Sequence, residues 1–341
     1  MSDRQLPPLA LTQGDPSGIG AELALKAWLL RDARGLPPFF ALADPAHLSR
    51  AGKALSLAVP IETTTPLQAN EVFARALPVV PLGVEVSAAP GKPNPADARA
   101  TILSIERAVE CVVDDAARAL VTSPIAKSVL YEAGFPHPGH TEFLGELARR
   151  HYGGGPRPVM MLWAQLSENE SLAVVPVTIH VALTEAPHLL TRDLLIETGE
   201  IVARDLSARF HIARPRLAFA GLNPHAGEGG AMGHEEIDVI APAIAALRAR
   251  GIDASGPHPA DTLFHAAARA NYDVALCPTH DQALIPIKTL AFDRGVNVTL
   301  GLPFVRTSPD HGTAFEIAGK GVADPSSLIE AIRLAGRLSE G

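Results

Sequence analysis

Short aliphatic runs alternate along the chain with stretches of helical periodicity. Each run spans five to seven residues, and most are apolar on both faces of the expected strand. Such runs are typical of strands in a parallel sheet that helices cover on both faces. We expect strands at residues 9–13, 38–44, 118–123, 158–164, 172–178, 216–222, 273–278 and 297–302.

Helices are expected between these runs. Within residues 96–115, for example, Ile102 and Ile105 belong to a set of apolar residues at helical spacing. The alternation of strands and helices predicts βαβ units and a mostly parallel sheet. Neither the Pro-rich stretch 76–95 nor the glycine-rich turn 153–158 is a clean linker, so two domains would share the chain discontinuously. Further helices are expected at 191–209, 233–250 and 325–339.

Composition and charge exclude several classes of protein. The 341 residues are 47% hydrophobic and carry a net charge of −8, which argues against a nucleic-acid binder with its basic surface. No apolar run approaches the roughly 18 residues that a membrane helix needs. The first 13 residues do not read as a signal peptide, and two cysteines are too few for a disulfide framework. We therefore expect a cytoplasmic protein that binds neither nucleic acid nor membrane.

Three histidines follow apolar runs at the point where each run ends. They are His180, His225 and His280. Ligands of parallel α/β sheets bind beyond the carboxyl ends of the strands, so these imidazoles could converge there on a metal ion. The alternative is that each histidine caps a turn by itself. Their separations of 45 and 55 residues resemble no local zinc motif and do not decide between the two.

Two segments have the features of anion sites at the start of a helix. The segment GDPSGIGAE, residues 14–22, follows a strand and places glycines before a helix. The alternative for this segment is a tight turn between strand and helix. His140 and Thr141 come just before another helix and could hold a phosphate there. The alternative is a capped helix with a surface histidine.

The segment 279–321 carries polar side chains among apolar neighbours. Lys288, Asn297 and Arg306 are single donors of the kind that a phosphate needs, although exposed lysines and arginines are common. Asp261 and Asp281 are acids close to the histidine runs; Asp261 could equally cap a helix. A loop with three glycines follows at residues 310–321 and could receive a nucleotide.

Seven segments in this order resemble the 4-hydroxythreonine-4-phosphate dehydrogenase family of vitamin B6 biosynthesis. They are GDPSGIGAE, GHTEFL, GLNPHAGEGG, HPADTLF, HDQALIPIK, GVNVTLGLPFVRTSPDHGTA and EIAGKG. The family is more distantly similar to isocitrate and isopropylmalate dehydrogenases. The resemblance therefore implies two α/β/α sandwich domains with mostly parallel sheets and the active site in the cleft between them. On this basis the first domain would comprise residues 1–125 and 290–341, and the second residues 126–289.

The resemblance also assigns roles to the residues. His180, His225 and His280 match divalent-metal ligands (zinc first, magnesium or cobalt as alternatives) in a homodimer whose active site is completed across the interface. Substrate-binding positions match at His140, Thr141, Lys288, Asn297 and Arg306, and the NAD-binding loop matches at His311, Gly312, Thr313 and Ala314. Lys288, Asp261 and Asp281 remain alternative candidates for the catalytic base.

The reaction implied is NAD-dependent oxidation of 4-phosphooxy-L-threonine at C3, followed by decarboxylation to 3-amino-2-oxopropyl phosphate. The preference between NAD and NADP stays open. A sister dehydrogenase acting on D-threonate or D-erythronate 4-phosphate is the first alternative. A metal-dependent phosphate-ester hydrolase and a non-catalytic binding protein for a phosphorylated metabolite are the others.

Overall fold

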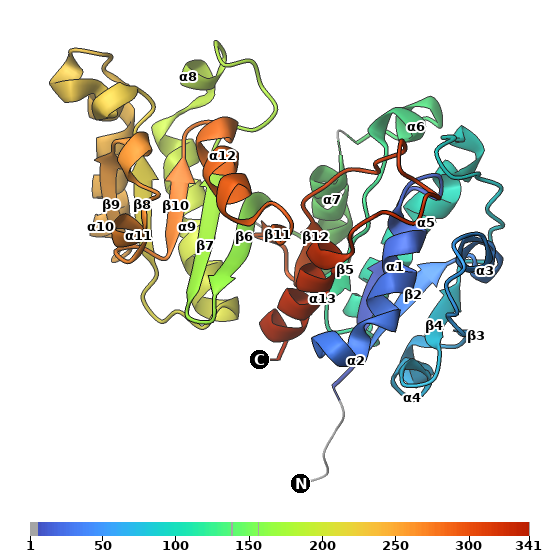
Figure 1. Ribbon diagram of the computed structural model, residues 1–341. Coiled ribbons are helices and arrows are strands. Elements are labelled where there is room, and N and C mark those ends of the chain that lie inside the picture. Colours follow the sequence, from blue (N-terminus) through green and yellow to red (C-terminus); the bar gives the residue numbers. More distant parts are fainter. Residues whose placement is uncertain (1–5, 138, 156, 341) are drawn as a thin grey trace, which may run out of the picture. The chain divides into compact units, whose positions relative to one another are not determined.

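The computed structural model describes residues 6–137, 139–155 and 157–340, and the chain divides into two compact units (Figure 1). Unit 1 comprises the segments Met1–Pro158 and Leu302–Gly341, and unit 2 comprises Val159–Gly301. Pro156, which belongs to the glycine-rich turn 153–158, lies outside the described residues.

The strands of unit 1 run in the order β3-β4-β2-β1-β5-β12, and every pairing between them is parallel. Hydrophobic strands such as β1 and β2 are buried at every position. The elements are β1 (Leu9–Thr12), α1 (Gly20–Leu29), α2 (Arg31–Arg34), β2 (Phe39–Ala43), α3 (Pro45–Ala54), β3 (Ile61–Thr63), η1 (Pro66–Gln68), α4 (Ala69–Phe73), β4 (Leu77–Pro81), η2 (Pro95–Asp97), α5 (Ala98–Val113), β5 (Leu120–Val121), α6 (Lys127–Glu132), α7 (His140–Tyr152), β12 (Arg306–Pro309) and α13 (Ser326–Leu338).

Helices cover both faces of the unit 1 sheet. Ala10 and Leu120 share a hydrophobic cluster with residues of α5 and α7, so these helices cover one face. Arg306 is paired in register with Leu120 and therefore points to that same face. The next residue, Thr307, points to the other face, where its hydroxyl donates to the Ala331 carbonyl of α13 at 2.8 Å. Arg306 is thus the first residue of a strand that lies between the two helical layers, and its side chain points to the face that α7 covers.

The strands of unit 2 run in the order β11-β6-β7-β10-β8-β9. The pairings β11–β6 and β6–β7 are antiparallel, and the remaining three are parallel. The elements are β6 (Val159–Ser167), β7 (Glu170–Pro176), α8 (Ala186–Leu189), α9 (Arg192–Arg209), β8 (Arg216–Ala220), η3 (Pro224–Gly230), η4 (Glu236–Ile240), α10 (Ala241–Ala249), β9 (Asp253–His258), η5 (Ala260–Thr262), α11 (Ala266–Arg269), β10 (Val274–Cys277), α12 (His280–Ala291) and β11 (Val296–Leu300).

One face of the unit 2 sheet packs against α12. Leu162 of β6 and Val174 of β7 share a buried cluster with Leu284 and Ile287 of α12. Asn297 of β11 is paired in register with Leu162, so its side chain points to this same face. α12 thereby covers the strands whose carboxyl ends lead to two of the histidines.

All eight expected strands are present, and the mostly parallel α/β class is confirmed. Four strands were missed, namely β3, β4, β9 and β12. The Pro-rich stretch 76–95, expected only as a crossing segment, contains β4. Two capping expectations were wrong: Gly139 rather than Thr141 precedes α7, and His265 rather than Asp261 caps the short helix α11. No helix in the described part of the chain is long and apolar enough to cross a membrane.

Both domain boundaries lie further along the chain than expected. The first follows Pro158 instead of residue 125, and the second precedes Leu302 instead of residue 290. The physical reason for the first is that Phe143 and Leu144 of α7 are buried in the core of unit 1. The reason for the second is that β11 pairs with β6 along five residues and so belongs to unit 2.

Candidate active site

Two of the three histidines lie side by side at the carboxyl ends of neighbouring strands. β7 and β10 are paired, and the pairing continues beyond both strands where Thr178 donates to the Pro278 carbonyl from its backbone N (3.1 Å) and its Oγ1 (2.7 Å). His180 and His280 each follow two residues later. Their ring centroids are 5.6 Å apart. The paired strands thus bring together two imidazoles that are 100 residues apart in sequence.

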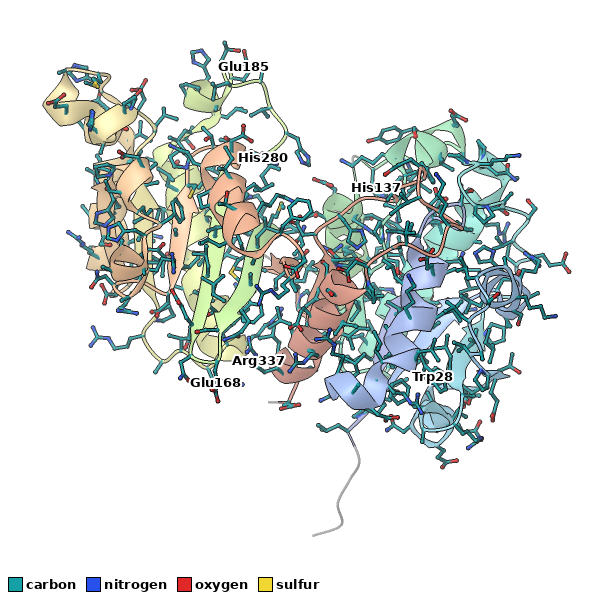
Figure 2. All side chains as sticks on the ribbon, viewed as in Figure 1. Trp28, His137, Glu168, Glu185, His280 and Arg337 are labelled. Atoms are coloured by element: carbon teal, nitrogen blue, oxygen red, sulfur yellow. The ribbon has the colours of Figure 1, made fainter. Side chains whose placement is uncertain are left out.

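His280 is held by its neighbour in the sequence. It is the first residue of α12 and is labelled in Figure 2. Its Nδ1 lies 2.8 Å from Oδ1 of Asp281, an arrangement that leaves Nε2 available to a ligand. The side chain of Asp281 is 78% exposed. A carboxylate that fixes an imidazole in this way orients it toward a metal ion in many metal sites.

His225 lies in a turn with left-handed backbone. Its φ is +51°, and Ala226 (+51°), Gly227 (+76°) and Glu228 (+43°) continue the turn. Non-glycine residues in this region cost roughly 1–2 kcal/mol each, so the turn depends on contacts that hold it. A Cβ on Gly227 would lie 2.5 Å from Oε2 of Glu236. The glycine therefore makes room for a carboxylate of the protein itself.

Glu236 anchors the start of this turn. Its carboxylate is buried and accepts hydrogen bonds from the backbone N (2.7 Å) and Nδ2 (3.0 Å) of Asn223, two residues before His225. Glu235 accepts a further bond from the Asn223 amide at 2.7 Å. The spacing of the histidine runs gave no sign of these acids, which come from the following segment.

Gln282 joins the segments that carry His280 and His225. Its Oε1 accepts from the backbone N and Oγ1 of Thr279, both at 3.1 Å, and so caps α12. Its Nε2 donates to the Gly221 carbonyl at 2.8 Å, at the end of β8. One side chain therefore fixes the helix that begins with His280 against the strand that leads to His225.

We expect Gln282→Ala to lower the free energy of unfolding by about 1–2 kcal/mol, because it removes a helix cap and leaves the Gly221 carbonyl without this donor. Urea denaturation measures the change. Gln68→Ala, in the exposed segment η1, serves as the control and should shift the free energy by less than about 0.5 kcal/mol. Equal effects of the two substitutions would contradict the bridging role.

The donor set fits a divalent cation in part. Two neighbouring imidazoles, one oriented by a carboxylate, suit zinc or cobalt. Within the described residues of a single chain, however, no three His, Cys, Asp or Glu side chains come together as a metal site. Asp261 lies exposed on η5, which packs against the turn of His225. The assignment of His180, His225 and His280 as one ligand set stays a prediction.

The other predicted polar residues of unit 2 lie on α12 and β11. Asn297 points to the face covered by α12, and its Oδ1 is buried without a hydrogen-bond partner among the described residues. Lys288 follows His280 on α12, with its Nζ 5.7 Å from the ring centroid of Phe292. A buried amide oxygen that accepts no bond is the kind of group that a ligand donor would satisfy.

A buried arginine forms the centre of a second group, in unit 1. Arg306 is 3% exposed, and its Nε and a terminal nitrogen donate to Oγ1 of Thr122 at 3.1 and 2.6 Å. Burial lowers the pKa of Arg306 to about 10, so the guanidinium stays charged at neutral pH. A buried charge of this kind favours an anion that can bind with two hydrogen bonds.

His140 adds a neutral imidazole to this group. It opens the helix α7, and its Nε2 is enclosed without a hydrogen-bond partner among the described residues. Burial lowers its pKa well below 6.5, and the charges of Arg306 and Lys127 lower it further. Thr141 follows it in the first turn of the same helix. The start of a 13-residue helix, an enclosed imidazole and a buried guanidinium are groups that suit an anion, and we call Arg306, His140 and Thr141 the anion group of unit 1.

The predicted cofactor loop packs on the glycine-rich turn near the N-terminus. Ile19 N donates to the Thr313 carbonyl at 3.1 Å, and a Cβ on Gly18 would lie 2.9 Å from that same oxygen. This glycine therefore allows contact with protein backbone, which supports the tight-turn alternative for residues 14–22. Nε2 of His311 is buried and without a partner among the described residues, and a nucleotide could satisfy it.

Comparison with known proteins gives the family. Residues 36–335 match the family described as pyridoxal phosphate biosynthetic protein PdxA. The chain belongs to this family. A 4-hydroxythreonine-4-phosphate dehydrogenase from Methylorubrum populi is 64% identical over 98% of this chain and 95% of its own. One from Bradyrhizobium diazoefficiens is 55% identical over 99% of both chains.

A solved structure of the same family supports the fold. The crystal structure of a 4-hydroxythreonine-4-phosphate dehydrogenase from Klebsiella pneumoniae matches with a TM-score of 0.84 and 33% identity, over 98% of this chain and 100% of that one. Membership of the PdxA family gives the chain a role in pyridoxal phosphate biosynthesis.

The lowered pKa of His140 makes the stability of this PdxA family chain depend on pH. The pKa of His140 in the folded state lies below the unfolded value of 6.5. The stability that depends on its neutral form is therefore fully present above pH 6.5 and is lost as pH falls toward the folded pKa. Burial lowers the pKa of His47 in the same direction. We expect the free energy of unfolding to fall between about pH 7.5 and 5.5, and to fall less in His140→Gln. Denaturant titrations at each pH measure this, with His151→Gln on the exposed side of α7 as the control; equal slopes in wild type and His140→Gln would contradict it.

Proposed function

We propose that the protein oxidises 4-phosphooxy-L-threonine at its C3 hydroxyl with NAD, and that the product loses CO₂ to give 3-amino-2-oxopropyl phosphate. The relatives named for this dehydrogenase activity support it, at up to 64% identity over nearly the whole chain. The observation that carries it is the anion group of unit 1, where Arg306 and His140 suit the phosphate of such a substrate.

The chemistry of each side chain suggests its role in binding. Arg306, with Thr122 behind it, would hold two phosphate oxygens, and the first turn of α7 would supply His140 and Thr141. This remote group contributes binding energy that orients the reacting carbon. His180, His225 and His280 would hold the cation. When bound, the cation supplies polarisation of the C3 hydroxyl and NAD supplies the acceptor for the hydride.

One side chain must take the hydroxyl proton. Asp281 bonds to His280 and is better placed to orient that ring than to act as the base. Lys288 and Asp261 remain the two candidates, and Asn297 would hold a substrate donor through its buried Oδ1. The pH profile of kcat in Lys288→Met and Asp261→Asn separates the two, because only loss of the base removes the lower limb of the profile.

We also propose a homodimer. Ile285 (62% exposed) and Phe292 (77% exposed) lie seven residues apart on α12, beyond His280, and Leu183 (75% exposed) follows His180. Large apolar side chains left exposed on the segments that follow His180 and His280 favour a second copy of the chain as their cover. A partner that completes the site would also explain why His225 does not join His180 and His280 within one chain. The cytoplasm is the proposed compartment, since both cysteines are unbonded thiols.

The test follows NADH absorbance with metal-replete protein, NAD and 4-phosphooxy-L-threonine. D-Threonate and D-erythronate 4-phosphates are run in parallel, as are NADP and a chelator. We expect chelator-sensitive turnover of the phosphothreonine. Turnover of a threonate or erythronate ester alone would move the protein to the sister activity. Release of inorganic phosphate without NADH would support a hydrolase, and binding without turnover would support a binding protein.

A further inference from the structure

Lys127 lies against the residue that precedes α7. Its Cε and Nζ lie 3.1 and 3.2 Å from the position that a Cβ on Gly139 would occupy. Oε2 of Glu142 lies 3.2 Å from the same position. Gly139 has φ −180° and ψ −171°, an extended backbone that any residue adopts. A Cβ at this position would therefore press on the end of the lysine side chain, whereas the backbone itself does not require glycine.

Lys127 brings a third basic side chain to the anion group of unit 1. It stands at the start of α6, whereas His140 opens α7 and Arg306 opens β12. The charges of both Arg306 and Lys127 act on the imidazole of His140 and lower its pKa. Three basic groups from three separate elements thus meet at one helix start. Two of these groups, Arg306 and Lys127, are cations, and an anion bound at this helix start would offset the repulsion between them.

We propose that Lys127 is a ligand of the substrate phosphate, reaching it over Gly139 together with Arg306 and His140. This rests on the proposed function and names a further binding residue for it. Arg306 provides a fixed, buried fork, whereas Lys127 is exposed and carries its charge on a flexible stem. The lysine side chain can therefore move with the phosphate as it enters, and it covers the solvent-exposed side of the anion group.

The test measures binding of inorganic phosphate by calorimetry and steady-state kinetics with the phosphorylated substrate. Lys127→Ala is expected to raise both the Kd for phosphate and the KM by about 10- to 100-fold, with kcat changed by less than about threefold. Lys127→Arg should recover part of the loss. Lys53→Ala, an exposed lysine on α3, is the matched control and should leave Kd and KM unchanged. Binding to Lys127→Ala should also depend less steeply on salt.

A double-mutant cycle tests the role of Gly139. Gly139→Ala displaces the Lys127 side chain and should raise the Kd for phosphate, but it should add little in a Lys127→Ala background, where the crowding side chain is gone. Equal effects of Gly139→Ala in both backgrounds would contradict the coupling. If Lys127→Ala binds phosphate like wild type while Arg306→Ala does not, the proposed function stands and the role of Lys127 is wrong. If wild type neither binds phosphate nor oxidises the substrate, both fall together.

Discussion

Replacing Arg306 with alanine is expected to lower kcat/KM for the phosphorylated substrate by about a thousandfold. The side chain is 3% exposed, and Thr122 fixes its orientation through bonds of 3.1 and 2.6 Å. The guanidinium is thus positioned before the phosphate arrives, and little entropy is lost when it binds. Alanine removes the charge and both donors at once, so the loss should fall mainly on KM.

Arg306→Lys separates charge from geometry. Lysine keeps the charge but not the planar guanidinium, so we expect Arg306→Lys to recover only part of the loss. Thr122→Val should weaken phosphate binding, because the guanidinium loses the hydroxyl that fixes its orientation. Arg333→Ala on the exposed side of α13, where the arginine pairs with Glu330, is the control and should retain full activity. Circular dichroism verifies that each variant is folded. A KM within about threefold of wild type in folded Arg306→Ala would show that the phosphate binds elsewhere.

The second large effect is expected from His280→Ala, which should abolish chelator-sensitive turnover and reduce bound zinc or cobalt. His280 is one of the two imidazoles whose centroids lie 5.6 Å apart, and it is the one that a carboxylate orients. Asp281→Asn keeps the ligand but weakens its orientation, so its metal affinity should fall by about 10- to 100-fold. Elemental analysis and the visible spectrum of cobalt-loaded protein report binding without reference to activity.

His188→Ala provides the matched control for this series. It removes another histidine of unit 2, on the short helix α8, that belongs to neither the observed pair nor the predicted ligand set. Its metal content and turnover should equal those of wild type. Should His280→Ala retain both, the pair of histidines would not be a metal site, and the proposed function would have to be revised to one without a cation.

The strands that the sequence predicts well are those with continuous apolar runs. β1, β2 and β10 are buried along their whole length, so each residue contributes to the signal. β12 has the sequence RTSP and β9 has DASGPH, so neither contains an apolar run that would predict a strand. Both are strands because they pair with neighbouring strands in the sheet. The antiparallel direction of β6 was equally unreadable, since a run of buried residues looks the same in either direction.

The candidate site was predictable where it depends on strand ends. The pattern of runs places both histidines directly after strands, and they meet because β7 and β10 pair, which the pattern does not say. The residues that hold the site were missed because their partners lie in other segments. Glu236 is 13 residues from Asn223, from which it accepts hydrogen bonds. Lys127 lies close to Gly139 in the folded chain, although the two belong to different segments. Gln282 could have been found, since Thr279 and Gln282 have the spacing of a capping box.

The discontinuity of unit 1 has a consequence for synthesis of the chain. β5 pairs with β1 on one side and with β12 on the other, and β12 belongs to the last 40 residues of the sequence. While the ribosome is still translating unit 2, residues 1–158 therefore have a sheet with an open edge at β5 and an apolar face that lacks α13. Such an edge invites pairing with other nascent chains. Unit 2 is continuous and can fold first, whereas completion of unit 1 must wait until residues 302–341 have been translated.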